Sequence, residues 1–407
     1  MRRVVHYSDI FMSGKKDRLA SRVRNIGTSA IREMMLLGSK VPGAISLAQG
    51  IPDARTPAYI RDGVIELLQK DHDIGKYAPS PGLPQLRKLA ADSVSTKGGF
   101  SVDWETQICI TAGAIEALAI AISTLVEEGD EVLLPDPGYP PYMEQIAFAK
   151  GKAVYVPLNA ERGWRLDLQT LERAITPKTK LLILANPSNP TGMVMGKDEL
   201  EGIAVLSAKH GFFVIADITY DFLVYDHAAP PSLLAYPEIR DNLLLCYSFS
   251  KEFSMTGWRA GFLYAPSYIY EQAAKVHDAF LLCAPTISQR AALIALTKRP
   301  SEDPEGIHAN LAEKREVICK RLDALSDLFS YSKPEGAYYV FAKYRKTRLD
   351  SRAFARKMLE EAKVICVPGI GFGPNGEGHV RFSYGCSREN LYEAFDRLER
   401  WNGTLGS

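Results

Sequence analysis

The runs LLILAN (residues 181–186), DELEGIAVLSAKHG (198–211) and FFVIAD (212–217) lie close together in the middle of the chain. The first and third are short and continuously apolar, as buried strands are, whereas the second has the periodicity of an amphipathic helix. Two strands joined through a helix in this way lie parallel in one sheet. This stretch therefore predicts an α/β fold.

Further runs of the same kind extend this pattern over residues 107–266. The expected strands are QICIT (107–111), EVLLP (131–135), KAVYVP (152–157), LLLCYS (243–248) and GFLYAP (261–266), with a helix AIEALAIAISTLV (114–126) after the first. Strands that are apolar on both faces are typical of a sheet covered by helices on both sides. We expect a large domain with a mostly parallel sheet between helices.

After residue 304 the pattern changes to that of a smaller α+β domain. Its expected elements are helices at 306–325, 351–363 and 388–401 and strands at 337–343, 364–369 and 379–385. A helix at 29–38 and a strand at 45–49 precede the large domain. We divide the 407 residues into an N-terminal arm that joins the small domain (1–50), a large domain (51–300) and a small C-terminal domain (301–407).

The composition excludes several classes of protein. Hydrophobic residues make up 46% and charged residues 24% of the chain, which is typical of globular proteins. Basic and acidic residues number 49 and 48, so no overall positive field draws the protein to nucleic acid or to a membrane. The six cysteines form no CxxC pair and the seven histidines are isolated, so we expect neither a disulfide framework nor a metal site.

Two features bear on localisation. The basic N-terminal stretch MRRVVHYSDIFMSGKK (1–16) lacks the apolar core of a secretory signal, because polar residues interrupt it. The longest apolar run, residues 113–126, contains Glu116 and is too short to span a bilayer. We therefore expect a cytoplasmic protein.

Polar side chains of different chemistry follow three of the predicted strands. Asn189 lies in NPSNPTG (186–192), Asp217 ends FFVIAD, and YSFSKEFSMTGWRAG (247–261) contains Lys251 and Arg259. Each has an ordinary explanation as a proline-rich turn, a structural ion pair or a solvated cation. Ligands of such folds bind at the carboxyl ends of strands, however, and an amine beside a guanidinium suits a carbonyl cofactor that carries a phosphate.

The ordered set NPSNPTG, AD-x-x-Y, SFSK and GWRAG resembles the class I/II aminotransferases, fold-type I enzymes that depend on pyridoxal 5′-phosphate. The resemblance covers nearly the whole chain, from about residue 21 to residue 401. It implies Lys251 as the Schiff-base lysine and Asp217 as the acid that pairs with the pyridine nitrogen. It also implies that Tyr220, which we count with these two as catalytic, and Asn189 hydrogen-bond the 3-hydroxyl of the ring.

The same resemblance implies a phosphate site. Ser248, Ser250 and Arg259 match phosphate ligands, together with the backbone amides of Gly113 and Ala114 in TAGAIEAL (111–118). The glycine and alanine open a helix directly after a strand, and the N-terminus of a helix attracts phosphate through free amides and its dipole. An ordinary strand-to-helix turn would have the same sequence pattern.

Four further residues carry over from the family motifs. Tyr139 in PDPGYPPY matches the aromatic residue that stacks on the cofactor ring, and Tyr77 in KYAPSPGLPQLR resembles the tyrosine that reaches the phosphate of the neighbouring subunit. Arg381 in HVRFSYG, a strand with an amphipathic pattern, matches the arginine that holds the substrate carboxylate. Gly50 in LAQGIPD borders the substrate together with Asn189.

The implied activity is that of a transaminase, which transfers an amino group from an L-amino acid to a 2-oxo acid such as 2-oxoglutarate. Ile115 follows Ala114, and the segment HDAFLL (277–282) contains no arginine where well-known aspartate enzymes carry one. We therefore expect an aromatic or other neutral amino donor. The implied assembly is a homodimer with shared active sites.

Two other functions are compatible with parts of this pattern. A pyridoxal-phosphate-dependent lyase or synthase of the same fold would use the same motifs for elimination. An aminotransferase-like transcriptional regulator is disfavoured, because the family pattern begins near residue 21 and leaves no room for a preceding DNA-binding module. The segment GFGPNGEG (371–378) matches the dinucleotide fingerprint G-x-G-x-x-G, but a strand follows it, so we interpret it as a loop over the active-site mouth or a plain connection.

Overall fold

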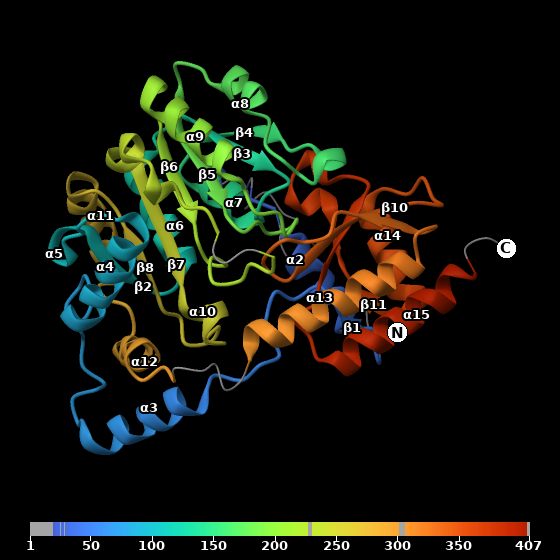
Figure 1. Cartoon of the computed structure of the whole chain (residues 1–407), viewed down its shortest axis with the longest axis horizontal. Coiled ribbons are helices and arrows are strands. Elements are labelled where there is room, and N and C mark those ends of the chain that lie inside the picture. Colours follow the sequence, from blue (N-terminus) through green and yellow to red (C-terminus); the bar gives the residue numbers. More distant parts are fainter. Residues whose placement is uncertain (1–18, 25, 28, 227–229, 301–305, 405–407) are drawn as a thin grey trace.

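The structure is a computed structural model and describes residues 19–24, 26–27, 29–226, 230–300 and 306–404. A seven-stranded sheet forms the centre of the larger part of the chain (Figure 1). Its strands are β2 (Ile108–Thr111), β3 (Glu131–Asp136), β4 (Lys152–Pro157), β5 (Thr179–Ala185), β6 (Phe213–Asp217), β7 (Leu243–Ser248) and β8 (Gly261–Tyr264). They lie in the order β2-β8-β7-β6-β5-β3-β4, in which β8 runs against its neighbours and the other pairs are parallel. The predicted mostly parallel sheet is therefore confirmed.

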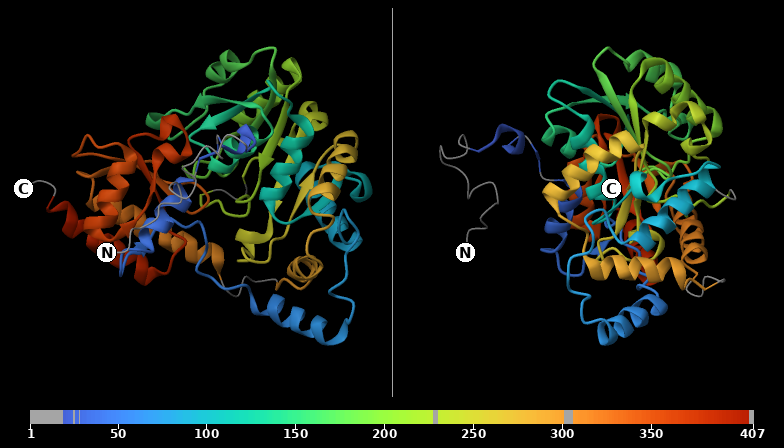
Figure 2. Two further views of the ribbon diagram at one scale, coloured as in Figure 1. Left: turned by 180° about the vertical axis from the view of Figure 1, so that it is seen from behind. Right: turned by 90° about the vertical axis from the view of Figure 1, so that its left-hand side faces the viewer.

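Helices cover both faces of this sheet (Figure 2). Leu182 and Leu184 of β5 belong to one buried cluster, with α4 (Pro84–Gly98) and α9 (Lys197–His210), whereas Leu181 and Ile183 belong to a second, with α6 (Ala114–Leu125) and α11 (Ser267–Phe280). Burial on both faces explains why the strands are continuously apolar. The other helices of this part are α3 (Ala58–Lys70), α5 (Trp104–Gln107), α7 (Pro140–Phe148), α8 (Leu168–Ala174), α10 (Phe249–Glu252) and α12 (Thr286–Thr297).

The C-terminal part contains a four-stranded antiparallel sheet in the order β12-β13-β10-β9. Its elements are α13 (Ile307–Ala324), β9 (Phe329–Tyr331), β10 (Tyr339–Tyr344), α14 (Ser351–Lys357), β11 (Val364–Ile365), β12 (Val367–Pro368), β13 (His379–Ser383) and α15 (Arg388–Asn402). The N-terminal strand β1 (Ile45–Ser46) pairs with β11, and α2 (Ala30–Gly38) packs beside it. The N-terminal segment thus lies against the C-terminal part; the domain boundaries at residues 50 and 300 stay predictions.

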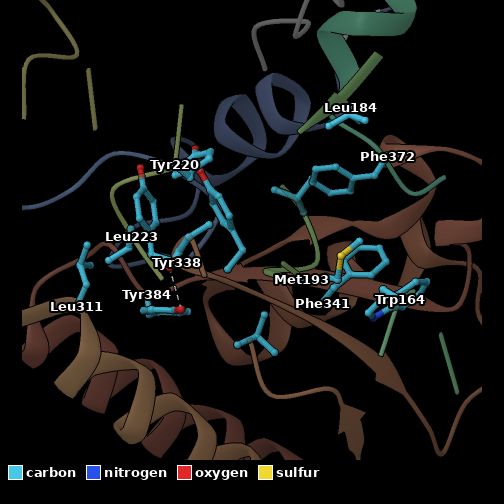
Figure 3. Close-up of a cluster of buried hydrophobic side chains, with 14 of the residues drawn as sticks. Trp164, Leu184, Met193, Tyr220, Leu223, Leu311, Tyr338, Phe341, Phe372 and Tyr384 are labelled. Carbon is cyan, nitrogen blue, oxygen red and sulfur yellow. Dashed lines mark hydrogen bonds between the residues drawn. The ribbon is translucent and has the colours of Figure 1, made fainter. Parts of the chain in front are cut away.

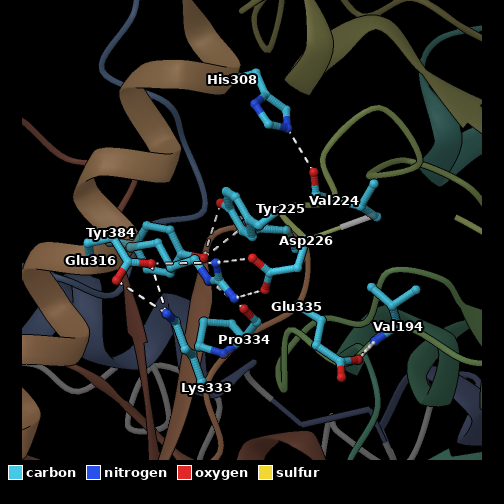
Figure 4. Close-up of polar contacts among 12 residues, drawn as sticks. Val194, Val224, Tyr225, Asp226, His308, Glu316, Lys333, Pro334, Glu335 and Tyr384 are labelled. Carbon is cyan, nitrogen blue, oxygen red and sulfur yellow. Dashed lines mark hydrogen bonds and ion pairs between the residues drawn. The ribbon is translucent and has the colours of Figure 1, made fainter. Parts of the chain in front are cut away.

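Side chains from both parts of the chain form a common core between them (Figure 3). The rings of Trp164 and Phe341 lie 5.3 Å apart, and those of Tyr220 and Tyr338 lie 5.5 Å apart. Polar contacts continue the junction, since the carboxylate of Glu335 accepts a hydrogen bond from the backbone N–H of Val194 at 3.1 Å (Figure 4). The two parts therefore hold each other in a defined geometry in this structure.

Two further predictions meet different outcomes. The connection between β12 and β13 consists of the short turns Gly369–Phe372 and Pro374–Gly376, and a strand follows it, as expected for a segment that is not a dinucleotide fingerprint. The stretch 1–16, which we judged not to be a secretory signal, lies outside the described residues. Within the described ranges, no helix combines the length and the hydrophobicity that a membrane crossing requires.

Candidate active site

A cavity of about 390 Å³ opens at the carboxyl ends of β5, β6 and β7, between the two parts of the chain. Most of the residues expected in the site line it. They are Gly50, Ala114, Tyr139, Asn189, Asp217, Tyr220, Ser248, Ser250, Lys251, Arg259 and Arg381. Since these residues come from segments more than 300 positions apart, it is the fold that brings them together.

Lys251 lies in the short helix α10, directly after β7. Its Nζ donates a hydrogen bond to the carbonyl oxygen of Gly50 at 2.5 Å, and the hydroxyl of Tyr338 donates to the same oxygen at 2.8 Å. Burial, together with the charges of Arg381 and Arg259, lowers the pKa of Lys251 to about 8. A substantial minority of the amine is therefore in its neutral, proton-accepting form near neutral pH, whereas an ordinary lysine is almost fully protonated there.

Asp217 ends β6 on the floor of the cavity and is 6% exposed. One carboxylate oxygen accepts a hydrogen bond from the hydroxyl of Tyr142 at 2.7 Å, and the other accepts one from the backbone N–H of Thr219 at 3.0 Å. Burial raises the pKa of Asp217 above its usual value, while these donors and the charge of Lys251 act against that shift. These donors favour the carboxylate form, against the effect of burial.

Arg259 lies beside the start of α6. Its Nη2 donates to the carbonyl oxygen of Ala112 at 2.9 Å, and its Nη1 donates to the carbonyl oxygen of Thr256 at 3.0 Å and lies 3.5 Å from Ser250 Oγ. Gly113 caps α6 with a φ of 88°, and a Cβ there would lie 2.7 Å from the guanidinium. Only glycine allows this approach, because it has no side chain and adopts positive φ freely.

Arg381 on β13 is 1% exposed. Its Nη1 donates to Asn189 Oδ1 at 2.9 Å, and its Nη2 donates to the carbonyl oxygen of Ala48. Its Nε has no acceptor among the described residues. The expectation of an amphipathic strand here is wrong: all five residues of β13 are buried, because the sheet is covered on both faces.

Aromatic residues form one side of the site. The hydroxyls of Tyr220 and Tyr339 lie 2.6 Å apart, and the Arg381 guanidinium lies 4.5 Å from the centre of the Tyr339 ring. The rings of Tyr139 and Tyr142 pack edge to face at 5.4 Å. A Cβ on Gly50 would lie 2.2 Å from the Tyr339 hydroxyl, which explains a glycine at that position.

The sequence interpretation missed several of these residues. Tyr142 lies in the quoted run PDPGYPPY, three residues after Tyr139, so both tyrosines flank the first turn of α7. Thr219 follows Asp217 by two residues, a spacing typical of a backbone N–H that bonds an aspartate. Tyr339 had no such signal, since β10 is buried on both faces and gives no alternation.

Tyr77 and Gly113 lie outside the set of lining residues. Gly113 borders the cavity through its contact with Arg259, as described above. Tyr77 is 82% exposed and does not line this chain's own cavity.

Part of the cavity lining, here called the apolar wall, consists of four apolar side chains. They are Ile115 and Leu118 of α6 and Ile31 and Met35 of α2. Among the described lining residues the charged groups are Asp217, Lys251, Arg259 and Arg381, which makes three cations and one carboxylate. The cavity therefore combines an excess of positive charge with an apolar wall.

Comparisons with known proteins agree with this site. The sequence profile of the family "Aminotransferase class I and II" matches residues 42–398. Aromatic-amino-acid aminotransferase 2 of Thermococcus litoralis and an aspartate aminotransferase of Pyrococcus abyssi are each 36% identical to this chain over 383 residues, covering 94% of this chain and 97% of each relative. The crystal structure of an aromatic aminotransferase from Pyrococcus horikoshii matches with a TM-score of 0.84 at 35% identity, over 92% of this chain and 100% of that chain.

The family profile and the two relatives span nearly all of the chain, as the motif resemblance does. The mostly parallel sheet and the covered smaller sheet also match the solved structure. The chain accordingly belongs to the class I and II aminotransferases and catalyses transamination.

Proposed function

We propose that this transaminase uses pyridoxal 5′-phosphate and prefers an amino acid with an aromatic or other neutral side chain as its amino donor. The observation that carries the cofactor assignment is the charge of the cavity, where Lys251, Arg259 and Arg381 face a single carboxylate, Asp217. Such an excess of positive charge suits two anions, the cofactor phosphate and the substrate carboxylate.

The residues at the start of α6 fit a phosphate group. The amides of Gly113 and Ala114 open the helix, and Ser248, Ser250 and Arg259 add two hydroxyls and a guanidinium. Arg259 adopts a φ of 56°, which is uncommon outside glycine and supports a functional reason for its position. These five residues would hold the phosphate.

The residues deeper in the cavity fit the pyridine ring. Asp217 would hold a proton on the ring nitrogen, Asn189 and Tyr220 would bind the ring hydroxyl, and Tyr139 would stack on the ring. When bound, the cofactor supplies an aldehyde and a ring that accepts electrons from the substrate α-carbon.

The chain's own groups would do the remaining work. Lys251 moves the proton at the substrate α-carbon, a role that suits an amine whose pKa burial lowers to about 8. Arg381, held by Asn189 and by the carbonyl of Ala48, orients the substrate carboxylate next to Gly50. A fixed guanidinium binds a carboxylate in one orientation, which keeps the α-amine toward Lys251.

The apolar wall supports the substrate preference. Ile115, Leu118, Ile31 and Met35 offer hydrophobic surface, and a charged donor side chain would lose hydration there without gaining a partner. The acceptor would be a 2-oxo acid such as 2-oxoglutarate. Kinetics with a panel of amino donors tests this preference: the hypothesis requires higher kcat/KM for neutral or aromatic donors than for aspartate.

The assembly that fits the chain best is a homodimer with shared sites. Tyr77 is highly exposed, as are the apolar residues Ile65 and Leu68 of α3 and Phe280 at the end of α11. Exposed apolar surface of this kind is typical of an interface between subunits. Tyr77 would then reach the phosphate of the partner subunit.

Replacement of Lys251 tests the proposed mechanism. Lys251→Ala is expected to lower the transamination rate by at least about 10²–10⁴-fold, because the proton-transferring amine is lost. Phosphate binding and the unfolding temperature of Lys251→Ala should stay close to those of the wild type. The surface variant Lys298→Ala is the control, and its transamination activity should match that of the wild type. Wild-type turnover by Lys251→Ala would contradict the assignment. Identification of the products distinguishes transamination from elimination, since only the former yields a new amino acid from the acceptor.

A further inference from the structure

A buried ion pair lies beside the first turn of α6. His277, near the end of α11, has a fully buried side chain, and its Nδ1 lies 2.9 Å from Glu116 Oε1. Its Nε2 lies 2.8 Å from the carbonyl oxygen of Ser80. Figure 1 shows α6 and α11 side by side, and the two helices pack on each other.

The geometry requires a charged imidazolium. A carboxylate and a backbone carbonyl can only accept hydrogen bonds, so both ring nitrogens of His277 must carry a proton to satisfy them. Although burial acts against the charged ring, the hydrogen bond and the charge of Glu116 raise the pKa of His277 above its usual value. The position at the carboxyl end of α11 also favours a cation.

Glu116 connects this pair to the proposed phosphate site. Its other carboxylate oxygen accepts a hydrogen bond from the backbone N–H of Ala112, whose carbonyl oxygen accepts from Arg259. Ala112 directly precedes Gly113, the residue that caps α6. The Glu116 carboxylate therefore lies at the end of α6 that would bind the phosphate. An uncompensated negative charge there would repel a second anion.

The pair also fixes a segment that belongs to no helix or strand. The Ser80 carbonyl bonded by His277 lies three residues after Tyr77, and the carbonyl of Lys76 accepts a hydrogen bond from the hydroxyl of Thr286 at 2.7 Å. These two contacts hold residues 76–80 against α11 and α12. The segment that carries Tyr77 is thus tied to the start of α6 through His277 and Glu116.

We propose that His277 is a positioning residue of the phosphate site: it neutralises Glu116 at the start of α6 and links that helix to the segment carrying Tyr77. The proposal rests on the proposed function, because it needs a phosphate at the start of α6. Glu116 then anchors the backbone of Ala112 without weakening the binding of the anion. His277 touches neither substrate nor cofactor and acts through Glu116 and Ser80.

Charge removal in two steps tests the proposal. His277→Gln keeps a donor for Ser80 but leaves the negative charge of Glu116 uncompensated. The Kd of the full-length, cofactor-free chain for inorganic phosphate should therefore rise about tenfold. A change of this order is expected for a charge at a helix terminus. The double variant Glu116→Gln/His277→Gln removes both charges, and its Kd should return to within about twofold of the wild-type value. Calorimetry gives both values.

Several measurements separate this proposal from a purely structural role. Pyridoxine, which lacks the phosphate, should bind the wild type and His277→Gln equally. His308→Gln is the matched control, since the ring of His308 also bonds a backbone carbonyl, that of Val224, and it should bind phosphate as the wild type does (Figure 4). Glu116→Gln alone should bind phosphate at least as well as the wild type, which provides a test even if His277→Gln does not fold.

An unchanged phosphate Kd in His277→Gln would overturn the proposal, as would a double variant as weak as the single one, because packing alone would then explain the loss. A tenfold loss of phosphate affinity in Glu116→Gln would also overturn it. Failure of the proposed function is a different result: the wild-type chain itself would bind neither inorganic phosphate nor pyridoxal 5′-phosphate.

Discussion

Burial acts on the two central ionisable residues of the site in opposite directions. It lowers the pKa of Lys251 to about 8, with help from the charges of Arg381 and Arg259, and it raises the pKa of Asp217. In both cases burial stabilises the neutral form relative to the charged form, because a charge is costly in a low-dielectric site. For Asp217, hydrogen bonds from Tyr142 and Thr219 act against this shift and favour the carboxylate without cancelling the effect of burial. For Lys251, the lowered pKa makes proton exchange easier near neutral pH.

Asp217→Asn tests the importance of that negative charge. An amide still accepts a hydrogen bond from Tyr142 or Thr219, but it cannot stabilise a positive charge in the cavity. We expect kcat to fall by about 10²-fold or more, in the range typical of lost acid–base groups, while bound cofactor falls much less. Steady-state kinetics and cofactor absorbance measure the two effects.

Asp221→Asn is the matched control for this variant. Asp221 follows Asp217 by four residues and pairs with Lys97 outside the cavity. Its replacement should leave kcat within a few fold of the wild type. A near-normal kcat in Asp217→Asn would mean that Asp217 is a structural acid.

The polar residues that follow strands were predictable from the sequence, and others were not. Asp217 ends an apolar run, Lys251 and Asn189 follow one within a few residues, and the structure brings all three into one cavity. Tyr142 and Tyr339 were missed because one lies in a helix and the other in a strand buried on both faces. Contacts between such residues depend on tertiary packing. The roles assigned to all of these residues stay predictions.

At the scale of elements, the fold class followed from the continuous apolar runs, because strands covered on both faces have no polar side. The same burial misled the interpretation of β13, whose polar residues Arg381 and Ser383 are buried although they resemble an exposed face. Most strand ends shifted by one or two residues; Phe212, for example, precedes β6. The strand expected at 45–49 already ends at Ser46, and the single strand expected at 364–369 is divided into β11 and β12. The strand β1 is only two residues long, because only these two residues pair with β11, which lies far away in the sequence.

The connection between β12 and β13 docks on the end of β3. The backbone N–H of Asn375 donates to Asp136 Oδ2, and its side chain donates to the carbonyl oxygens of Asp136 and Leu158, each at 2.9 Å. Asp136 is 2% exposed, and its Oδ1 has no partner among the described residues. This connection therefore joins the smaller sheet to the larger one through a buried, half-satisfied carboxyl group.

The buried carboxyl group predicts a dependence of stability on pH. Burial raises the pKa of Asp136 to about 6, against about 3.9 for an unfolded aspartate. The folded state thus binds the proton more tightly, and stability declines as pH rises from about 4 to 6. Asp136→Asn removes this loss, so at pH 8 it should raise the free energy of unfolding by about 2 kcal/mol, and the gain should vanish near pH 4.

Urea unfolding of Asp136→Asn and the wild type at both pH values measures the difference. Asn375→Ala is the comparison variant, because it removes donors but keeps the buried carboxyl group; it should be less stable than the wild type at both pH values. Lower stability of Asp136→Asn at pH 8 would show that the carboxylate is needed as an acceptor.

At the scale of the whole molecule, the exposed apolar residues indicate where a second subunit would bind. Ile65 and Leu68 of α3 are each more than 50% exposed, and Phe280 at the end of α11 is 60% exposed. The hydroxyl of Thr286 at the start of α12, which packs on α3, bonds the carbonyl of Lys76, so Tyr77 belongs to the same region. A second subunit on this surface would bury apolar area and receive Tyr77, in line with the proposed homodimer.

Complementation between two variants, one inactive and one with weakened cofactor binding, tests whether the active sites are shared. Lys251→Ala removes the amine of a site, and Tyr77→Ala should weaken its phosphate binding by about tenfold, the loss of one hydrogen bond to a charged group. If Tyr77 serves the partner's site, a mixed dimer contains one site with both residues intact and one with neither. Random assembly of equal amounts should then yield about a quarter of the wild-type activity at a cofactor concentration that leaves Tyr77→Ala mostly unloaded. If Tyr77 serves its own subunit, or if the chain is monomeric in light scattering, the mixture would only match the mean of the two variants, and the shared site would be refuted.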